Sequence, residues 1–541
     1  MKIAVIGGGI SGLIAAINLK KKYHNYHIFI IEKNEWCGGR LYQNIIDNYV
    51  LNNGPSWYWM NDIIQDVYHK LNIDCNYDLM KPNYQYQFIY NGKTIKIPNN
   101  KDDIRKLILS FDPECGNKYD TFIKHSKEKY DICKKEFLYY NNISLTEYLS
   151  YKTLSQLFKL DLFKSYRQVI NDISDNDNVR KILEWPALFI GENPETICGL
   201  FTILTYSMIV DGTSIPSKNG MIDIIKSLEK KALELGVKIY TNSNVFKYGF
   251  IDSKYSNNDY QDTNSNKIQY ISFLDKNGEK SDLTIDYVIN SSDYYFNELL
   301  LPNKYRSYPQ EYWNNLSICP QSTLFNIVLN KKIPKLLYHN LFFKNDYKSA
   351  FYVNKTSAYF DEVPTSCENL FILYPNSFSE KIYEFIIDNL RGFLGIDITN
   401  HIIYKHIDTP KDFKIRFNAF KGNSYGIGMD NYQFGFFRPC IKSRFVSNLY
   451  NCGQLTNPGP GIPPCMISGL ISSNLLLKSI ELNNDNNKNI WFFIIFIKNI
   501  WIFITNMIVM IKTCGFNYEW FKKEFNFVFF DKIYTYSNYN E

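Results

Sequence analysis

The chain has 541 residues, enough for about two to four domains with large hydrophobic cores. Its formal net charge is only +6, with Lys and Arg scattered along the sequence, which argues against nucleic acid as a partner. Eleven Cys residues without a CxxC pair, and seven His residues without ligand spacing, argue against a metal site and against a disulfide framework.

The beginning of the chain predicts a dinucleotide-binding βαβ unit. An apolar run at residues 3–6 indicates a buried strand, and a glycine-rich turn then leads into an amphipathic helix that begins near Ser11. Gly7 makes the tight turn and Gly9 lets the backbone approach a pyrophosphate. Gly12 lets the helix pack closely on the strand, so that the phosphates face the positive end of the helix.

An acid and a second glycine turn strengthen this prediction. Glu32 lies 20 residues past Gly12, after an apolar strand at residues 28–31, where a carboxylate can accept hydrogen bonds from both ribose hydroxyls. The GGR at 38–40 resembles the extra phosphate-contacting turn of two-dinucleotide-binding-domain flavoproteins, which favours FAD over NAD. Arg40 then balances the charge of the pyrophosphate.

The next part of the chain changes from mixed to helical patterns. A helix is expected up to Leu71, and the alternating pattern at 77–97 predicts a hairpin. Residues 100–210 have mostly helical periodicity. The apolar run at 198–210 is too short to span a bilayer, so we expect it in a core.

Two later segments return to nucleotide-domain patterns. Residues 215–245 indicate a turn, an amphipathic helix that ends near Gly236, and a strand. A polar insertion at 252–266 is expected to be an exposed hairpin, followed by strands that include 286–290. Residues 448–477 then predict the element that completes the nucleotide domain.

These segments predict an α/β fold in which two domains are interleaved. One is an FAD-binding Rossmann-like domain of the two-dinucleotide-binding-domain flavoprotein type, and the other is a mixed α+β substrate domain. A hydrophobic C-terminal tail follows. The expected ranges are 1–70, 215–290 and 445–485 for the FAD-binding domain, 71–214 and 291–444 for the substrate and membrane-facing domain, and 486–541 for the tail.

The tail is expected to hold the protein at a membrane. The apolar stretch at 490–511 is long enough to cross about 30 Å of hydrocarbon as a helix, although Lys498 costs roughly 2.5 to 3.5 kcal/mol there. A helix packed on the protein body is the alternative. Because the first strand begins at residue 2, we expect no cleaved signal peptide and a catalytic body on the cytoplasmic side.

The motifs in this order resemble the bacterial and fungal type of phytoene desaturase, in the FAD-dependent carotenoid desaturase family. The resemblance covers about residues 2–480. Besides the nucleotide unit it rests on GPSWYWM (54–60), LEWPALFIGENP (183–194), YHNLFF (338–343), FNAFKGNSYG (417–426), FFRP (436–439) and GQLTNPGPGIPPCMISG (453–469).

The resemblance implies which residues hold FAD. The ADP half is assigned to Gly7, Gly8, Gly9, Ser11, Gly12, Glu32, Lys33, Gly38, Gly39 and Arg40, and the adenine side to the backbone of Val245. Gly54, Pro55 and Ser56 are expected beside the flavin, with Gly453, Gln454, Gly461, Ile462 and Pro463 closing over the ribityl chain and ring.

Two positions depart from the family pattern. The turn at 218–221 is KNGM where the family has lysine-glycine-glycine-methionine, and Gln454 stands where many flavoproteins place an aspartate. Neither change removes a group that FAD requires, because backbone amides do most of the phosphate binding. No catalytic residue is assigned, and Arg167, Arg180 and Glu184, near the expected cap of the flavin pocket, are interpreted as structural charges.

The implied reaction is stepwise desaturation of phytoene towards lycopene or neurosporene, by hydride transfer to flavin and proton loss. Its expected partners are an apolar polyene, a membrane surface, and a quinone or oxygen as electron acceptor, without a built-in NADPH site. The Tyr and Phe content is explained by an apolar tunnel or, as we favour, by a compositional bias.

Two alternatives remain open. One is a carotenoid isomerase or retinol-saturase-like flavoenzyme. The other is a non-enzymatic protein similar to Rab escort proteins and GDP-dissociation inhibitors, which have this fold without FAD. The intact glycines and Glu32 argue against the second alternative.

Overall fold

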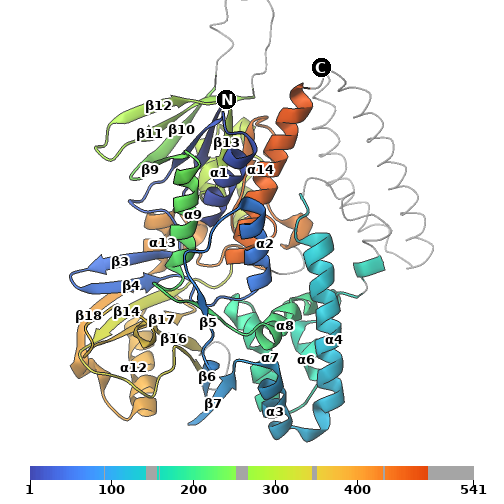
Figure 1. The fold of residues 1–541 in the computed structure, drawn as a ribbon, viewed down its shortest axis with the longest axis vertical. Helices are drawn as coiled ribbons and strands as arrows, with labels where there is room; N and C mark the ends of the chain where they lie inside the picture. The colour runs from blue at the N-terminus through green and yellow to red at the C-terminus, as the bar shows by residue number, and fades with distance from the viewer. Residues whose placement is uncertain are drawn as a thin grey trace, which may run out of the picture.

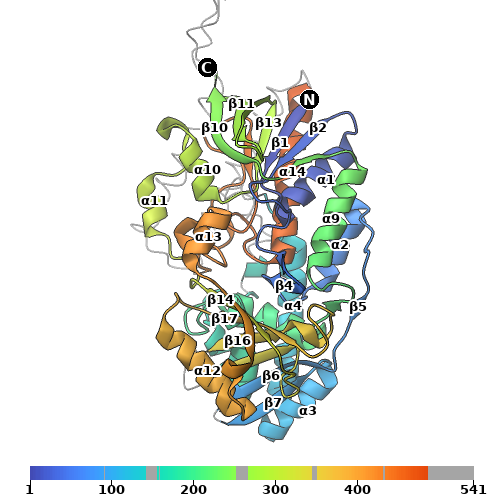
Figure 2. The same ribbon diagram turned by 90° about the vertical axis from the view of Figure 1, so that its left-hand side faces the viewer.

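The computed structural model describes residues 1–90, 92–141, 155–157, 159–250, 266–343, 350–429 and 433–484. These residues form an elongated molecule with a parallel sheet at one end and a larger, mainly antiparallel sheet towards the other (Figures 1 and 2). The N-terminus lies at the end with the parallel sheet (Figure 1).

The parallel sheet brings together strands from distant parts of the sequence. Its order is β19-β13-β1-β2-β9, and each neighbouring pair is parallel. The apolar runs predicted at 3–6, 28–31 and 286–290 form its three central strands. The bounds are β1 (Lys2–Ile6), β2 (His27–Ile31), β9 (Lys238–Tyr240), β13 (Tyr287–Asn290) and β19 (Leu449–Asn451).

Both faces of this sheet are covered, which explains why its strands are apolar throughout. Alternate residues of β1 enter different cores: Ile3 and Val5 pack with the helices, whereas Ala4 and Ile6 pack with a three-stranded antiparallel sheet. That small sheet consists of β10 (Asn244–Phe250), β11 (Ile268–Leu274) and β12 (Lys280–Thr284).

The helical face carries α1 (Ile10–Lys22), α9 (Ile222–Glu234), α14 (Ile462–Asn484) and α2 (Asn61–Leu71), which lie together in Figure 1. Helices α1 and α14 approach very closely, since a Cβ atom on Gly469 would lie 2.3 Å from the Ser11 carbonyl oxygen. The predicted helices at 11 and 222 onward are confirmed, and α9 ends just before Gly236, which has a φ of 83°.

The larger sheet has the order β18-β14-β17-β16-β15-β6-β7. It is antiparallel except for the pair β15 and β6, and β6 and β7 form the predicted hairpin. Its strands are β6 (Tyr84–Tyr90), β7 (Lys93–Pro98), β14 (Thr323–Leu329), β15 (His339–Phe343), β16 (Phe351–Lys355), β17 (Glu368–Tyr374) and β18 (Ile402–Asp408).

Helices cover both faces of this sheet as well. One face packs against α12 (Glu380–Leu394), while the other packs against the helices predicted within 100–210. These are α3 (Lys101–Phe111), α4 (Gly116–Ile132), α6 (Tyr166–Asn171), α7 (Asp177–Phe189) and α8 (Ile203–Val210). The apolar run at 198–210 therefore lies in a core, as expected, with Met208 and Ile209 buried.

Shorter elements join the two sheets. They are β3 (Tyr42–Ile46), β4 (Tyr49–Asn53), β5 (Leu79–Met80), β8 (Ile215–Pro216), α10 (Tyr294–Leu300), α11 (Gln310–Asn315) and α13 (Pro410–Phe417). The strands β3 and β4 pair with each other, and so do β5 and β8.

One helix of the described residues, Ile462–Leu482 within α14, is long and apolar enough to cross a membrane. However, 67% of its most apolar window is buried inside the protein, as in a core helix. The predicted anchor at 490–511 and nearly all of the insertion predicted at 252–266 lie outside the described residues.

Candidate functional site

A cavity of about 1140 Å³ extends from the carboxyl ends of β1 and β2 to the helices beside the larger sheet. The two ends differ in chemistry. We call the part lined by Gly7, Gly9, Glu32 and residues 38–40 the nucleotide end. The aromatic end is lined by Trp57, Trp59, Trp185, Phe189, Phe201 and Phe434.

The glycine turn leaves the start of α1 open to the cavity. Gly9 is the N-cap of α1 and no side chain caps the helix, so its first backbone amides lack intrahelical acceptors. A Cβ atom on Gly9 would meet nothing within 4 Å, which leaves space directly in front of these amides. The positive end of α1 and this space form a cradle for an anion.

Gly8 and Gly12 belong to the turn without lining the cavity. The Gly8 amide donates to Glu32 Oε2 at 2.7 Å, and a Cβ atom on Gly8 would lie 2.8 Å from the Cys37 sulfur. A Cβ atom on Gly12 would lie 2.2 Å from the Gly7 carbonyl oxygen, so helix and strand meet where only glycine fits. The packing role predicted for Gly12 agrees with this contact.

Glu32 is buried at the end of β2 and is held by backbone and side-chain donors. Its Oε1 accepts hydrogen bonds from the Asn34 backbone amide and from Asn34 Nδ2, both at 2.8 Å. Burial raises the pKa of the Glu32 carboxyl, and the bonds from Asn34 and Gly8 oppose that rise. The carboxyl group therefore has a fixed orientation at the cavity wall, suited to accept from ribose hydroxyls.

Arg40 is the partly buried cation of the nucleotide end. Its Nη2 donates to the carbonyl oxygen of Asn423 at 3.2 Å, and its guanidinium lies 5.4 Å from the centre of the Phe417 ring. Arg40 Nε has no hydrogen-bond partner among the described residues. Burial lowers the pKa of Arg40, and the Asp293 carboxylate opposes that shift. A partly buried cation with a buried, unused donor fits an anionic group.

The other residues assigned to the ADP half also line the cavity. Ser11, Gly38 and Gly39 lie at its wall, as does Val245 at the start of β10. Lys33 lines the cavity too, but its ammonium group donates to the carbonyl of Ile415 and to Asn418 Oδ1, at the end of α13. Lys33 therefore joins the nucleotide end to α13.

The segment from Gly453 to Pro463 lines one side of the cavity, and its closing over the ribityl chain and ring stays a prediction. Gly453, Gln454, Gly461, Ile462 and Pro463 all line it, as do Gly54, Pro55 and Ser56 on a separate segment. The Gln454 side chain donates from Nε2 to Asn423 Oδ1 at 2.7 Å. Gln454 therefore bonds to the same residue as Arg40.

Arg438 fixes this closing segment, a role that sequence reasoning missed. Its Nη2 donates to the Gln454 carbonyl at 2.7 Å, and its Nε donates to the Thr456 carbonyl at 3.0 Å. The side chain is fully buried, which lowers its pKa to about 10. The FFRP motif at 436–439 was the available signal for this role. An arginine among apolar neighbours is expected to be partly buried, and a buried arginine is almost always paired with acceptors.

Closely packed rings form the aromatic end. Trp57 lies 5.2 Å from Trp59 and 6.0 Å from Trp185, and Phe189 lies 4.6 Å from Trp59, measured between ring centroids. Two of these rings come from the segment after Gly54 and two from α7. This end offers a wide apolar surface suited to an apolar ligand.

A hydrogen-bonded chain of three side chains lies against Trp57 at the aromatic end. Ser56 Oγ lies 2.8 Å from the Tyr352 hydroxyl, which lies 2.5 Å from His339 Nδ1. The His339 ring stacks on Trp57 at 3.9 Å. Burial lowers the pKa of His339 well below its usual range, so this imidazole is neutral.

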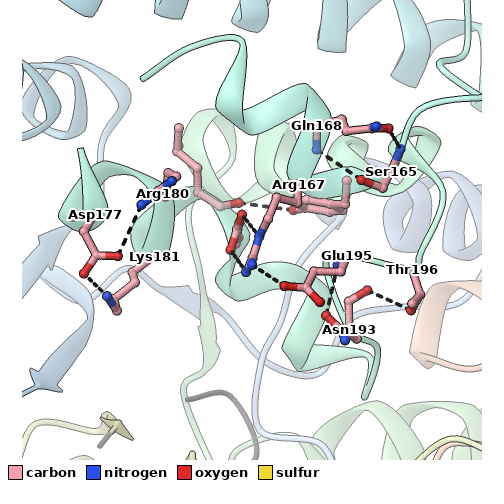
Figure 3. A network of polar contacts seen from close by, with 12 residues as sticks. Ser165, Arg167, Gln168, Asp177, Arg180, Lys181, Asn193, Glu195 and Thr196 are labelled. Carbon is pink, nitrogen blue, oxygen red and sulfur yellow. Dashed lines mark hydrogen bonds and ion pairs between the residues drawn. The ribbon is translucent and has the colours of Figure 1, made fainter. Parts of the chain in front are cut away.

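Three charges near α7 are structural, as interpreted from the sequence. Arg167 donates to both carboxylate oxygens of Glu184, at 2.9 and 2.8 Å, and also to Glu195 at 2.6 Å. Figure 3 shows Arg167 beside Glu195, and Arg180 near Asp177. Arg167, Arg180 and Glu184 do not line the cavity.

Comparisons with known proteins agree with this architecture. A family described as NAD(P)-binding Rossmann-like domain matches residues 5–71. The solved structure of an oxidoreductase from Methanosarcina mazei has a TM-score of 0.56 at 14% identity, covering 87% of this chain and 99% of that one. A putrescine oxidase triple mutant has a TM-score of 0.58 at 14% identity, covering 88% and 99%.

Relatives with named activities align with most of the chain. A carotenoid 3,4-desaturase from Haloarcula japonica is 25% identical, covering 88% of this chain and 98% of the relative. A 4,4'-diapophytoene desaturase (4,4'-diaponeurosporene-forming) from Staphylococcus haemolyticus is 26% identical, covering 89% and 99%.

The fold and the cavity define a chain with a Rossmann-like dinucleotide-binding domain, whose architecture is similar to the solved structures of the Methanosarcina mazei oxidoreductase and of putrescine oxidase. The resemblance to carotenoid desaturases is confirmed by relatives of that name that align with nearly nine-tenths of the chain.

Proposed function

We propose that the chain binds FAD in the cavity and desaturates a phytoene-like polyene there. The observation that carries the proposal is one continuous cavity with an anion cradle at one end and packed aromatic rings at the other. The amides of α1, Glu32 and Arg40 would hold the ADP half, and residues 54–56 and 453–463 would flank the flavin. FAD, when bound, would supply an acceptor for a hydride, which carries the two electrons removed from the substrate.

The chain's own residues orient the polyene and exclude water. A polyene without polar atoms is held by burying apolar surface, at about 25 cal/mol per Å². Trp57, Trp59 and Phe189 provide such a surface, and their mutual contacts fix its shape. The relatives' names support desaturation of a carotenoid-type substrate, and conversion of phytoene towards lycopene or neurosporene is the particular reaction we propose.

The test uses bacteria that accumulate phytoene, with a parallel strain that accumulates the C30 polyene diapophytoene. We expect coloured products that are lighter by two hydrogens for each step. Unchanged phytoene and diapophytoene, from a protein shown to hold FAD, contradict the proposal. Products of equal mass identify an isomerase, products that gain two hydrogens identify a saturase, and a purified protein without flavin absorbance favours the non-enzymatic alternative.

We also propose that the cavity receives its substrate from a membrane surface on the cytoplasmic side, with a membrane quinone or oxygen as the final electron acceptor. Leu162 lines the cavity and is followed by Phe163, whose side chain is 91% exposed. Phe437 lines the cavity as well and is 50% exposed. Exposed aromatic side chains beside an apolar cavity are typical of a membrane-contacting entrance.

Vesicle flotation tests the membrane proposal. With vesicles of phosphatidylcholine and phosphatidylglycerol, Phe163→Ser is expected to lower the bound fraction about two- to threefold, because less apolar surface enters the interface. Ile45→Ser is the matched control, since Ile45 is 73% exposed on β3 and does not line the cavity. Equal losses in both variants, or no loss in Phe163→Ser, contradict this entrance.

A further inference from the structure

The end of α7 places one carboxylate at the cavity wall. Helix α7 ends at Phe189, and Gly191 follows with a φ of 79°. The Gly191 amide donates to the Leu188 carbonyl at 2.9 Å and the Glu192 amide donates to the Ala187 carbonyl at 3.1 Å. These two bonds form a Schellman motif, which fixes the backbone of Glu192 relative to the helix.

The Glu192 side chain is also fixed. Its Oε1 accepts from the Met429 backbone amide at 2.7 Å, and the Cys319 thiol lies 3.6 Å from the same oxygen. Met429 in turn contacts the closing segment, because a Cβ atom on Gly459 would lie 3.0 Å from its methyl carbon. Arg438, which holds the carbonyls of Gln454 and Thr456, lies 3.2 Å from the Met429 sulfur.

Glu192 differs from the other carboxylates at the described wall of the cavity, which are Glu32 and Asp293. Glu32 belongs to the nucleotide end. Asp293 accepts from the backbone amides of Phe420 at 3.0 Å and Phe296 at 3.3 Å, and its charge acts on Arg40. Glu192 instead follows α7, which supplies Trp185 and Phe189 to the aromatic end.

We propose that Glu192 is the base that accepts the proton lost from the polyene. The inference rests on the proposed function. In each desaturation, one C–H bond breaks with its electron pair, and the hydride passes to bound oxidised flavin. The neighbouring C–H bond releases its proton to the Glu192 carboxylate, and the electron pair left behind forms the new C=C bond. The polyene loses two electrons and the flavin gains them.

The position of Glu192 suits this role. The carboxylate lies between the aromatic end, which would hold the polyene, and the segment 453–463, which would flank the flavin. Glu192 is only partly buried, so the accepted proton can pass on to water. A positioned general base contributes about 10² to 10⁴ in rate.

The test compares Glu192→Gln with Glu195→Gln. In Glu192→Gln the new side-chain amide oxygen still accepts from the Met429 amide, so FAD content and unfolding temperature are expected to stay at wild-type values. Glu195 is the matched control, because it follows in the same segment, is 59% exposed and pairs with Arg167 outside the cavity. In single turnovers with phytoene, we expect Glu192→Gln to form product about 100-fold more slowly and Glu195→Gln to match the wild type.

A second measurement separates a base from a structural support. Deuterium is placed in turn at each of the two carbons that lose hydrogen. Glu192→Gln is expected to increase the isotope effect at one carbon only, whereas a structural defect changes both or neither. Glu192→Asp, which keeps the carboxylate, is expected to be faster than Glu192→Gln.

The outcomes are distinguishable. Product formation within threefold of the wild type in Glu192→Gln overturns the role of Glu192 and leaves the proposed function intact. Loss of FAD or of thermal stability in that variant, without a change in isotope effect, identifies Glu192 as structural. A wild-type holoprotein that desaturates neither phytoene nor diapophytoene overturns both proposals.

Discussion

The two ends of the cavity are built on different principles. The nucleotide end uses backbone amides, glycines and two charged side chains, all within residues 7–40. The aromatic end uses side chains from the segment 57–59, from α7 and from residues near 201 and 434. Backbone recognition demands glycine at fixed spacing, whereas apolar packing accepts many combinations of large side chains. A sequence motif therefore reveals the first end far more readily than the second.

The largest effect on stability is expected at Gly12, where the backbone of α1 packs directly against the backbone of the glycine turn. Gly12→Ala places a Cβ atom 2.2 Å from the Gly7 carbonyl oxygen, so α1 must move away from β1. We expect a destabilisation of about 3 kcal/mol or more, together with loss of FAD from the purified protein. Urea unfolding and the flavin absorbance measure the two effects.

The control for this substitution is Gly392→Ala. Gly392 lies exposed within α12, and a Cβ atom there would meet nothing within 4 Å. It is expected to stabilise the protein by about 0.5 to 1 kcal/mol, through helix propensity alone. Wild-type stability and full FAD content in Gly12→Ala would show that the close contact is not required.

The next effect concerns the acid of the nucleotide end. Glu32→Ala removes the acceptor of the Gly8 and Asn34 amides and of the proposed ribose contact. Affinity for FAD is expected to fall about 10- to 100-fold, as measured by titration of the apoprotein. The aromatic end does not contact Glu32, so polyene binding to the apoprotein stays unchanged. Full FAD occupancy in Glu32→Ala would refute the ribose role.

A substitution at the aromatic end should have the converse effect. Phe189→Ala removes the ring that lies 4.6 Å from Trp59. We expect polyene affinity to fall about tenfold through lost apolar contact, whereas FAD affinity stays at the wild-type value. Equal losses of both ligands would show that the two ends do not act separately.

The smallest effect concerns the pH dependence of stability. Because burial lowers the pKa of His339, the native protein binds fewer protons than the unfolded chain below about pH 6.5. The free energy of unfolding therefore falls as the pH decreases through this range. His339→Gln is expected to reduce that slope by at most about 1.4 kcal/mol per pH unit, as measured by urea unfolding between about pH 5 and pH 7.5.

Exposed His24 supplies the control for this measurement. His24→Gln makes the same exchange at an exposed position, and the two variants are measured side by side. An unchanged slope in His339→Gln would show that another group causes the loss of stability in acid.

Local patterns predicted the nucleotide end and most elements of the fold. The strands at 3–6 and 28–31, the helix near Ser11 and the position of Glu32 directly after the second strand follow from short-range periodicity and spacing. The parallel pairing of β6 with β15 could not be predicted, because Gln87 and Asn340 face each other across more than two hundred residues of sequence.

The roles of Arg438 and Glu192 escaped prediction for a related reason. Each depends on acceptors or donors from another segment: Arg438 on the carbonyls of Gln454 and Thr456, and Glu192 on the amide of Met429. A single sequence contains both partners without indicating that they meet.

The order of strands in the parallel sheet has a consequence for synthesis. β1 is made first, yet its neighbour β13 follows more than 280 residues later and β19 completes the edge at residues 449–451. At translation rates of about 5 to 20 residues per second, roughly 20 to 90 s pass between the synthesis of β1 and the synthesis of β19. Throughout this time the apolar faces of β1 and α1 lack their final cover, so the growing chain exposes surface prone to aggregation until β19 and α14 have been translated.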